Sequence, residues 1–360
     1  MSEVIEPLEQ MCGTLIERKK ALRAALSKLP RRKLGHFPTP LDKCERFSAS
    51  LGGVSVWVKR DDCSGLAFGG NKTRQLQFVL GDALASGADV IIQGAASQSN
   101  HSRQVAAASA KLGVKCVLMP RQDKKASVVQ GNALIARLFG AEIEPVPNDA
   151  SMKEAKDRTA ARLREAGHTP FVVGMGAERA LTLAALAYID ALLEIVDEFE
   201  YRGEPLPTHI YTTSQGSTQA GLLAGARLLG LNIRVVGINP MDASNEAYVD
   251  VSAIEQQAIG AAALVGYSIE LKPGDVENCT DFVAPGYGLP SPEGQEAIAM
   301  MARLEGMLFD PVYSGKGLSG MVGHIRSSVI PSGARVVFIH TGGLPALFSY
   351  SDEMLASGEA

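Results

Sequence analysis

The chain has 360 residues, of which 46% are hydrophobic and 21% are charged, and its formal net charge is -4. This is an ordinary soluble composition, and it gives no sign of a nucleic-acid or membrane-surface partner. The length exceeds the size at which a single hydrophobic core usually stops growing, so we expect two domains.

The five cysteines are odd in number, widely spread and without CxxC spacing. This usage is typical of a reduced, cytosolic protein rather than of a disulfide scaffold or a zinc site, so we expect no metal. No stretch is long and apolar enough to span a bilayer, and the N-terminus lacks the order of a secretory signal. We therefore expect a cytoplasmic protein.

Residues 1–34 have a mostly helical pattern, in which Leu15, Leu22, Leu26 and Leu29 fall near one face with basic residues between them. We interpret this segment as a helical extension that makes packing or oligomer contacts. A basic membrane-binding helix is the alternative, but the glutamates of the segment argue against it.

From residue 53 onward, short apolar segments typical of strands alternate with helical patterns. The strand candidates are residues 54–59, 89–93, 115–119, 171–173, 209–213, 234–239 and 335–340. The helix candidates include residues 71–85, 99–112, 128–139, 152–166, 181–199, 218–229 and 292–305. This alternation predicts an α/β fold of parallel, twisted sheets covered by helices on both faces. Residues 202–207 are the best candidate for a surface crossing between domains.

In such folds ligands bind beyond the carboxyl ends of strands, where glycine-rich turns meet helix N-termini. The motif GGNKTR at residues 69–74 places Lys72 in the first turn of a helix, directly after two glycines. The positive end of the helix dipole lowers the pKa of a lysine there and favours the neutral amine that forms a Schiff base. The alternative is a solvated surface lysine that follows a glycine turn.

Two further strand-to-helix turns carry polar groups. SQSNH at residues 97–101 could bind a carboxylate on free backbone N–H groups or hydrogen-bond a phenolate oxygen, although simple helix capping explains it as well. SQGSTQAG at residues 214–221 indicates a phosphate cradle. It lacks both the GK[ST] ending and the GxGxxG pattern, so the phosphate group of a cofactor fits better than a nucleotide.

Tyr287 in PGYGLP (285–290) and Tyr313 in DPVYSGK (310–316) lie in glycine and proline turns. A rigidly held tyrosine can present its hydroxyl as an acid or base, and the alternative is a packed aromatic ring. IHTGG at residues 339–343 could line a ring, although His340 alone is more often a core histidine.

Together, in this order and spacing, the motifs resemble the family of 1-aminocyclopropane-1-carboxylate (ACC) deaminase and D-cysteine desulfhydrase. The resemblance runs from about residue 37 to residue 347. Its most specific pieces are GLAFGGNKTRQLQF (65–78), QSNHSRQ (98–104), QGSTQAG (215–221), YGLP (287–290) and DPVYSGK. It implies an enzyme of the fold type II, tryptophan-synthase-β-like class that uses pyridoxal 5'-phosphate (PLP).

Within that fold we expect a helical extension at residues 1–34, a large PLP-binding domain at 35–85 and 190–360, and a small α/β domain at 86–189. The motif at 97–101 should face the turn at 215–218 across the two domains. We also expect a homodimer and a small amino acid as substrate.

The resemblance implies three groups of site residues. The catalytic group is Lys72, Ser99, Tyr287 and Tyr313. The cofactor-binding group is Lys72, Asn71, Asn100, Gln215, Gly216, Ser217, Thr218 and Ser314, with Lys72 as the Schiff-base lysine, Asn100 on the 3'-oxygen of the ring and residues 216–218 on the phosphate. The substrate-binding group is Ser99, Asn100, His101, Tyr287 and Tyr313.

The informative departure is Ser314, because ACC deaminases carry a glutamate after the tyrosine, facing the pyridine nitrogen. A carboxylate there keeps the nitrogen protonated and suits cyclopropane opening, whereas a hydroxyl provides no counter-charge. D-cysteine desulfhydrases and L-cysteate sulfo-lyases have a hydroxyl residue at this place. Ser314 therefore favours α,β-elimination, although GLAFGGNKTR and QGSTQAG look more like ACC deaminase.

The expected reaction converts a β-substituted amino acid such as D-cysteine into a 2-oxo acid, ammonia and the released substituent. ACC deamination, L-cysteate sulfo-lysis and binding of an amino acid without turnover are the alternatives. Residues 174–179 and 121–129 depart from the family pattern and could border the substrate pocket. Arg179 could pair there with an anionic substrate tail, or it could form a salt bridge at a helix start.

Overall fold

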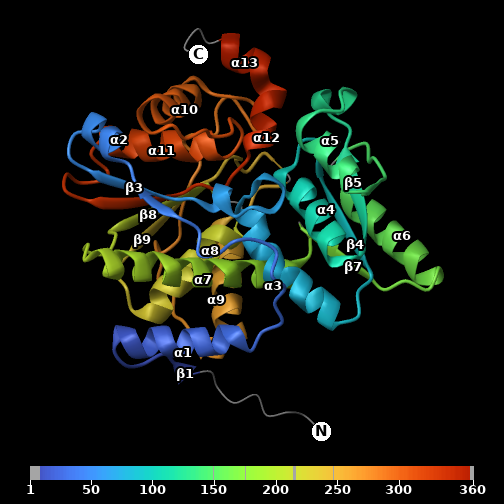
Figure 1. Cartoon of the computed structure of the whole chain (residues 1–360), viewed down its shortest axis with the longest axis horizontal. Helices are drawn as coiled ribbons and strands as arrows, with labels where there is room; N and C mark the ends of the chain where they lie inside the picture. Colours follow the sequence, from blue (N-terminus) through green and yellow to red (C-terminus); the bar gives the residue numbers. More distant parts are fainter. Residues whose placement is uncertain (1–8, 149, 175, 214–215, 246, 357–360) are drawn as a thin grey trace.

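Parallel strands alternate with helices along most of the chain, as the sequence pattern predicts (Figure 1). The structure is a computed structural model that describes residues 9–148, 150–174, 176–213, 216–245 and 247–356. None of the helices in these described ranges is both long and apolar enough to cross a membrane.

The larger sheet has six strands. In spatial order these are β11 (Glu277–Cys279), β9 (Arg234–Ile238), β8 (His209–Thr213), β12 (Arg335–Ile339), β3 (Ser55–Lys59) and β2 (Leu41–Lys43). All neighbouring pairs are parallel except β2 with β3. In the central strand β12, Val337 lies opposite Trp57 on one side and Ile210 on the other. Because β11, β9, β8, β12 and β3 are parallel, their carboxyl ends lie at the same edge of the sheet.

Helices cover both faces of this sheet because successive side chains of a strand point to opposite faces. Val337 and Ile339 of β12 belong to the core shared with one set of helices, and Val336 and Phe338 belong to a second core on the other face. The first set is α3 (Asn71–Ala85), α7 (Glu178–Arg202), α8 (Ser217–Leu229) and α9 (Val251–Leu264). The second set is α2 (Glu45–Ser50), α10 (Pro292–Glu305) and α11 (Ser314–Arg326). Figure 1 shows α7, α8 and α9 below the sheet and α10 and α11 above it.

The smaller sheet is formed by residues between 90 and 173 and is parallel throughout. Its spatial order is β6 (Glu142–Ile143), β5 (Lys115–Arg121), β4 (Val90–Ala96) and β7 (Pro170–Val173). The helices around it are α4 (Asn100–Leu112), α5 (Gly131–Leu138) and α6 (Met152–Glu165). Ile92 and Val117 pack against α6, and Ile91 and Leu118 belong to the main core on the opposite face.

The connection from the smaller sheet to the helices of the larger sheet comes before residues 202–207, where the sequence pattern placed it. Residues 174–177 connect β7 to α7, and α7 already packs against α3, α8 and α9. Residues 203–208 therefore join α7 to β8 rather than one sheet to the other. The predicted domain boundary at residue 189 falls inside α7, and the two-domain division stays a prediction.

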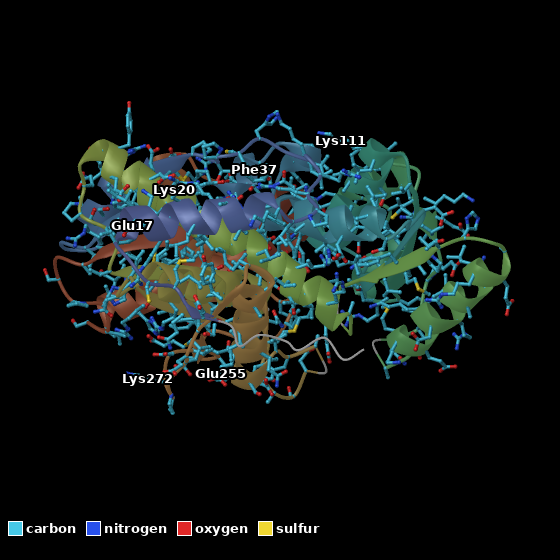
Figure 2. All side chains as sticks on the ribbon, turned by 90° about the horizontal axis from the view of Figure 1, so that it is seen from below. Glu17, Lys20, Phe37, Lys111, Glu255 and Lys272 are labelled. Carbon is cyan, nitrogen blue, oxygen red and sulfur yellow. The ribbon has the colours of Figure 1, made fainter. Side chains whose placement is uncertain are left out.

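Residues 9–27 of the N-terminal segment are part of the fold. Helix α1 (Leu15–Ser27) begins at Thr14, whose hydroxyl accepts from the N–H of Glu17 while the Glu17 carboxylate accepts from Thr14. Leu22 and Leu26 are buried where α1 packs against α7 and α8. Figure 2 shows Glu17 and Lys20 on α1, and both are exposed. The remaining elements are β1 (Glu9–Gln10), paired with β10 (Tyr267–Ser268), and the short helices α12 (Leu344–Leu347) and α13 (Ser351–Ala356).

Candidate active site

A cavity of about 170 Å³ lies where the carboxyl ends of β4, β8 and β12 meet the start of α3. Most of the predicted site residues line it. These are Asn71, Lys72, Ser99, Asn100, His101, Ser217, Thr218, Tyr287 and Tyr313. Ser314 lies behind Tyr313 rather than in the cavity lining, and Gln215 lies outside the described residues. Residues 99–101 and the start of α8 thus line the same cavity.

Lys72 is held in place by two glycine turns that touch. Gly70 has a φ of 125°, and a Cβ built on it would lie 2.7 Å from Nε2 of Gln104 and 3.0 Å from the carbonyl oxygen of Thr341. A Cβ on Gly342 would lie 2.7 Å from the Cα of Gly70. The N–H of Asn71 donates to the Thr341 carbonyl at 3.0 Å. Only glycine permits this approach, which places the next side chain, Lys72, at the cavity.

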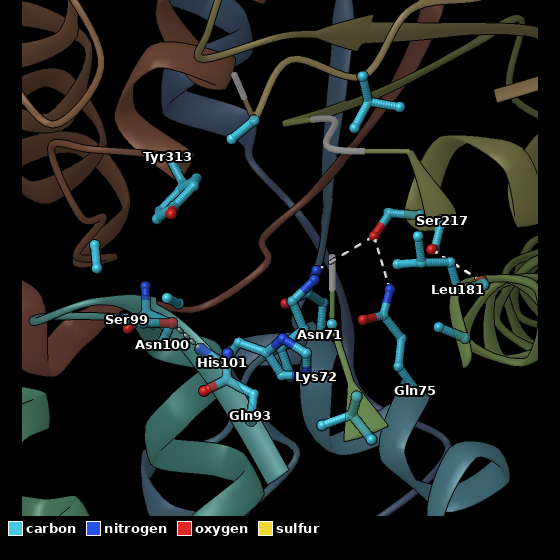
Figure 3. Close-up of a pocket in the computed structure, with 18 of the residues that line it drawn as sticks. Asn71, Lys72, Gln75, Gln93, Ser99, Asn100, His101, Leu181, Ser217 and Tyr313 are labelled. Atoms are coloured by element: carbon cyan, nitrogen blue, oxygen red, sulfur yellow. Dashed lines mark hydrogen bonds between the residues drawn. The ribbon is translucent and has the colours of Figure 1, made fainter. Parts of the chain in front are cut away.

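The amine of Lys72 gives up its proton more readily than that of a lysine in water. Its removal from water lowers the pKa of Lys72 to about 8, because burial disfavours the charged form. Figure 3 shows His101 beside Lys72 and Tyr313 on another side of the pocket. Burial, together with the charge of Lys72, lowers the pKa of His101 to about 3, so this imidazole is neutral near pH 7. A neutral amine in a closed site is a nucleophile and a base.

Ser99 and Asn100 begin α4. The hydroxyl of Ser99 accepts from the N–H groups of His101 and Ser102 at 3.1 and 3.2 Å, so Ser99 is the N-cap of the helix. Oδ1 of Asn100 accepts from Nδ2 of Asn132 at 2.9 Å. This bond fixes the oxygen of Asn100 as an acceptor, so Nδ2 is the donor end of this cavity-lining amide.

The start of α8 has the form of an anion cradle. Gly216 precedes the helix with a φ of 97°, and the first N–H groups of a helix have no partner within it. Thr218 accepts hydrogen bonds from Nδ2 of Asn71 at 3.2 Å and Nε2 of Gln75 at 3.3 Å (Figure 3). The hydroxyl of Ser217 points elsewhere, to the Leu181 carbonyl at 2.9 Å and Gln257 at 3.0 Å, so Ser217 offers the cavity its backbone rather than its side chain.

The two tyrosines meet in the cavity. The hydroxyl groups of Tyr287 and Tyr313 form a short hydrogen bond, and their ring centroids are 5.9 Å apart. Burial and the neighbouring Tyr287 raise the pKa of Tyr313 well above its ordinary value, so the Tyr313 hydroxyl stays protonated at neutral pH. One of the two hydroxyl groups therefore donates to the other.

A carboxylate lies directly behind Ser314. The Ser314 hydroxyl donates to Oδ1 of Asp310 at 2.6 Å, and this carboxylate also accepts from the N–H groups of Val312, Tyr313 and Ser314. Asp310 and Ser314 are both fully buried. Sequence reasoning missed Asp310, although its position at the start of DPVYSGK was a usable signal.

Other contributing residues were also missed. Arg103 of α4 donates to the carbonyl oxygens of Ala67 and Gly69, in the turn that leads to Lys72. Oε1 of Gln104 accepts from the N–H of Thr73 at 2.6 Å and from its hydroxyl at 2.9 Å. The motif QSNHSRQ contains both residues, but nothing in it shows that they reach α3.

Arg179 forms a salt bridge with Asp82, with 2.6 Å between Nη2 and Oδ1. Of the two interpretations of this residue, the structure thus supports a salt bridge at a helix start. Arg121, in the other atypical segment, does line the cavity.

The whole chain has relatives of known class. Residues 32–342 match the family model of the pyridoxal-phosphate-dependent enzymes. The chain is 38% identical to a 1-aminocyclopropane-1-carboxylate deaminase of Methylobacterium sp. (strain 4-46), over 91% of this chain and 98% of that protein. It is 36% identical to a D-cysteine desulfhydrase of Klebsiella pneumoniae (strain 342), over 90% of this chain and 97% of that protein. A crystal structure of an ACC deaminase homologue superposes with a TM-score of 0.83 at 31% identity, covering 94% of this chain and 99% of that one.

The protein therefore belongs to the family of pyridoxal-phosphate-dependent enzymes. The predicted α/β fold of type II, the predicted cofactor and the predicted class of PLP-dependent lyase or deaminase are confirmed. Both branches named by the sequence resemblance, ACC deaminase and D-cysteine desulfhydrase, are found among its relatives at similar identity.

Proposed function

We propose that the protein catalyses the PLP-dependent α,β-elimination of a β-substituted amino acid such as D-cysteine, giving a 2-oxo acid, ammonia and the released substituent. The observation that carries this proposal is the cavity itself. It gathers the amine of Lys72, the donors of α4 and the tyrosine pair, while a hydroxyl rather than a carboxylate follows Tyr313. The similarity to a D-cysteine desulfhydrase supports the same reaction.

The residues present fit the cofactor. Lys72 would hold its aldehyde, Nδ2 of Asn100 would donate to its phenolic oxygen, and the start of α8 at Gly216 and Thr218 would hold its phosphate. Asn71 would act through Thr218. The sequence resemblance assigns Ser314 to the ring nitrogen, and Ser314 lies buried next to Tyr313, directly behind the cavity lining. Bound PLP withdraws electrons from the Cα of the amino acid attached to it and so makes its proton acidic.

The remaining groups would act on the substrate. Ser99 and His101 lie at the start of α4, where N–H groups can bind the α-carboxylate. The neutral Nζ of Lys72 would accept the proton from Cα. The Tyr287 and Tyr313 hydroxyls, joined by their hydrogen bond, would supply a proton to the departing β-substituent. The predicted homodimer and cytoplasmic location stay predictions.

Deamination of ACC is a second candidate, and Asp310 favours it. Because Asp310 accepts the hydroxyl proton of Ser314, a negative charge lies one hydrogen bond behind that hydroxyl. This charge could support a protonated ring nitrogen, which ring opening requires. Four donors already share that charge, so it is weaker than the charge of a carboxylate at residue 314 itself.

A substrate screen separates the candidates. The holoenzyme is offered D-cysteine, L-cysteine, β-chloroalanine, cysteate, serine and ACC, and release of 2-oxo acid and ammonia is measured. We expect at least one β-substituted alanine, with D-cysteine foremost, to be turned over faster than ACC. Ser314→Glu should shift the ratio of rates toward ACC or slow elimination, whereas the matched control Ser314→Thr, which keeps the hydroxyl, should leave the ratio near that of the wild type. Efficient deamination of ACC with every β-substituted alanine untouched would overturn elimination, and binding without any turnover would overturn both.

The lowered pKa of Lys72 predicts how the apoenzyme recovers its cofactor. Only the neutral amine attacks the aldehyde of PLP, so the attachment rate should rise about tenfold per pH unit at low pH. It should level off near the pKa of about 8. Stopped-flow absorbance after mixing apoenzyme with PLP measures this rate. A rate that still climbs steeply beyond pH 10 would mean that Lys72 titrates like a lysine in water.

A further inference from the structure

Lys316 is a buried cation that the proposed chemistry does not use. It lies in the first turn of α11 and is fully buried, with 0% of its surface exposed. Its Nζ donates to three backbone carbonyl oxygens of one turn, those of Val283, Ala284 at 3.3 Å and Gly286 at 2.7 Å. Within the described part of the chain, no salt bridge to a carboxylate accompanies these bonds.

Burying the Lys316 ammonium here destabilises the fold unless the ammonium has a structural or functional role. Burial removes the hydration of the charge, which costs free energy. A cation in the first turn of a helix is also repelled by the positive end of the helix dipole. A methionine of similar volume would fill the space without either penalty. An ammonium has three N–H donors, which match three converging carbonyl oxygens. Packing alone therefore does not account for a lysine at residue 316.

The turn that Lys316 binds carries a residue of the site. Gly286 also donates its N–H to the Val283 carbonyl at 3.0 Å, so the turn closes around the ammonium. The next residue, Tyr287, lines the cavity, and its hydroxyl contacts that of Tyr313. Tyr313 in turn precedes α11, the helix that carries Lys316. One cation thus fixes the turn of one tyrosine relative to the helix of the other.

We propose that Lys316 is a positioning residue whose ammonium acts as a built-in monovalent cation, holding the turn at residues 283–287 so that Tyr287 meets Tyr313. When the side chain is shortened, the carbonyl oxygens form a site for a free potassium or ammonium ion. Backbone carbonyl groups replace the hydration shell of such ions readily. Only the turnover readout of this proposal rests on the proposed function.

The test compares Lys316→Ala, which vacates the site, with Lys316→Met, which removes the charge but fills the space. Each holoenzyme is measured in potassium, ammonium or tetramethylammonium chloride at equal ionic strength. Misplacement of a reacting group by about 1 Å costs on the order of 100-fold in rate, so in tetramethylammonium we expect both variants to lose kcat by about that factor with a much smaller change in KM. Potassium and ammonium should restore kcat and raise Tm for Lys316→Ala, and not for Lys316→Met or the wild type.

A second measurement is independent of turnover. Crystals of Lys316→Ala soaked in rubidium chloride should show an anomalous peak among the carbonyl oxygens of residues 283–286. A folded Lys316→Ala without that peak and without a salt-specific rise in Tm overturns the cation site, and Lys316→Met with wild-type kcat overturns the positioning role. If Lys316→Ala does not fold, Lys316→Gln, with two donors, should give a kcat between those of Lys316→Met and the wild type; equality with Lys316→Met would contradict the proposal. If the wild type turned over none of the substrates, the proposed function would be overturned. The rubidium and Tm results would still test the cation site.

Discussion

Replacing Lys72 by alanine should lower turnover by on the order of 10⁴-fold or more, because it removes the group that attaches the cofactor and takes the proton. The protein should still fold, since Lys72 points into the cavity and the glycine turns that hold it remain. The visible absorbance of covalently attached PLP should disappear. Turnover, absorbance and melting temperature measured together separate the loss of chemistry from the loss of fold.

The control for this variant is Lys20→Ala, on the exposed side of α1 (Figure 2). It should keep the absorbance and the rate of the wild type. Borohydride reduction of the wild type followed by peptide mapping should place the reduced cofactor on Lys72. A label on any other lysine would show that the site is assigned to the wrong residue.

Replacing Arg74 by methionine should lower the free energy of unfolding by about 3–5 kcal/mol, because it leaves buried carboxylates without their partner. Arg74 is fully buried and binds Asp61 at 2.9 Å and Glu194 at 2.7 Å. Lys59 also reaches Glu194, at 2.7 Å, but it cannot replace both contacts. Urea unfolding measures the loss, and Arg326→Met serves as control. The Arg326–Glu296 pair is about half exposed and should contribute less than about 1 kcal/mol.

The same cluster predicts a pH dependence. Burial raises the pKa values of Asp61 and Glu194, but the charge and hydrogen bonds of Arg74, together with the charge of Lys59, outweigh it and hold both values below their ordinary range. A carboxyl group whose pKa is lowered by folding stabilises the fold when the pH is above its ordinary pKa. This stabilisation is lost as the pH falls through the lowered pKa. The gap between wild type and Arg74→Met should therefore be widest near neutral pH and narrow on acidification. A gap that widens below pH 4 would contradict this assignment.

Local pattern was enough to predict the central strands of both sheets, but it did not predict the short strands β2, β6 and β11, and it named neither α9 nor α11. Strands β3, β8, β9 and β12 are short and buried on both faces, so their apolar runs stand out between helical segments. Helix α11 was missed because it contains four glycines, which disfavour a helix. Two of them lie against strands of the larger sheet. A Cβ on Gly317 would lie 2.2 Å from Oγ1 of Thr213, and one on Gly320 would lie 2.6 Å from Cδ1 of Ile238. The helix lies so close to the sheet that only glycine fits, which is a tertiary requirement.

For the site as well, the sequence predicted the features that depend on local pattern and missed those that depend on tertiary packing. Residues that line the cavity sit in glycine turns at strand ends, and those turns are visible in sequence. The sequence did not reveal that Ser217 turns its hydroxyl to Leu181, because this depends on how α7 packs against α8. It also did not reveal that Asp310 lies behind Ser314, where the last turn before α11 folds back on itself.

The bonds of Arg103 and Gln104 have a mechanical consequence. Both residues belong to α4, which covers the smaller sheet, yet they hold Ala67, Gly69 and Thr73 on either side of Lys72. If the smaller sheet rotated outward with these bonds intact, it would drag the start of α3 along. If they broke, the arginine would lose the carbonyl partners of its buried charge. As long as these bonds hold, a swing of the smaller sheet is therefore also a displacement of Lys72.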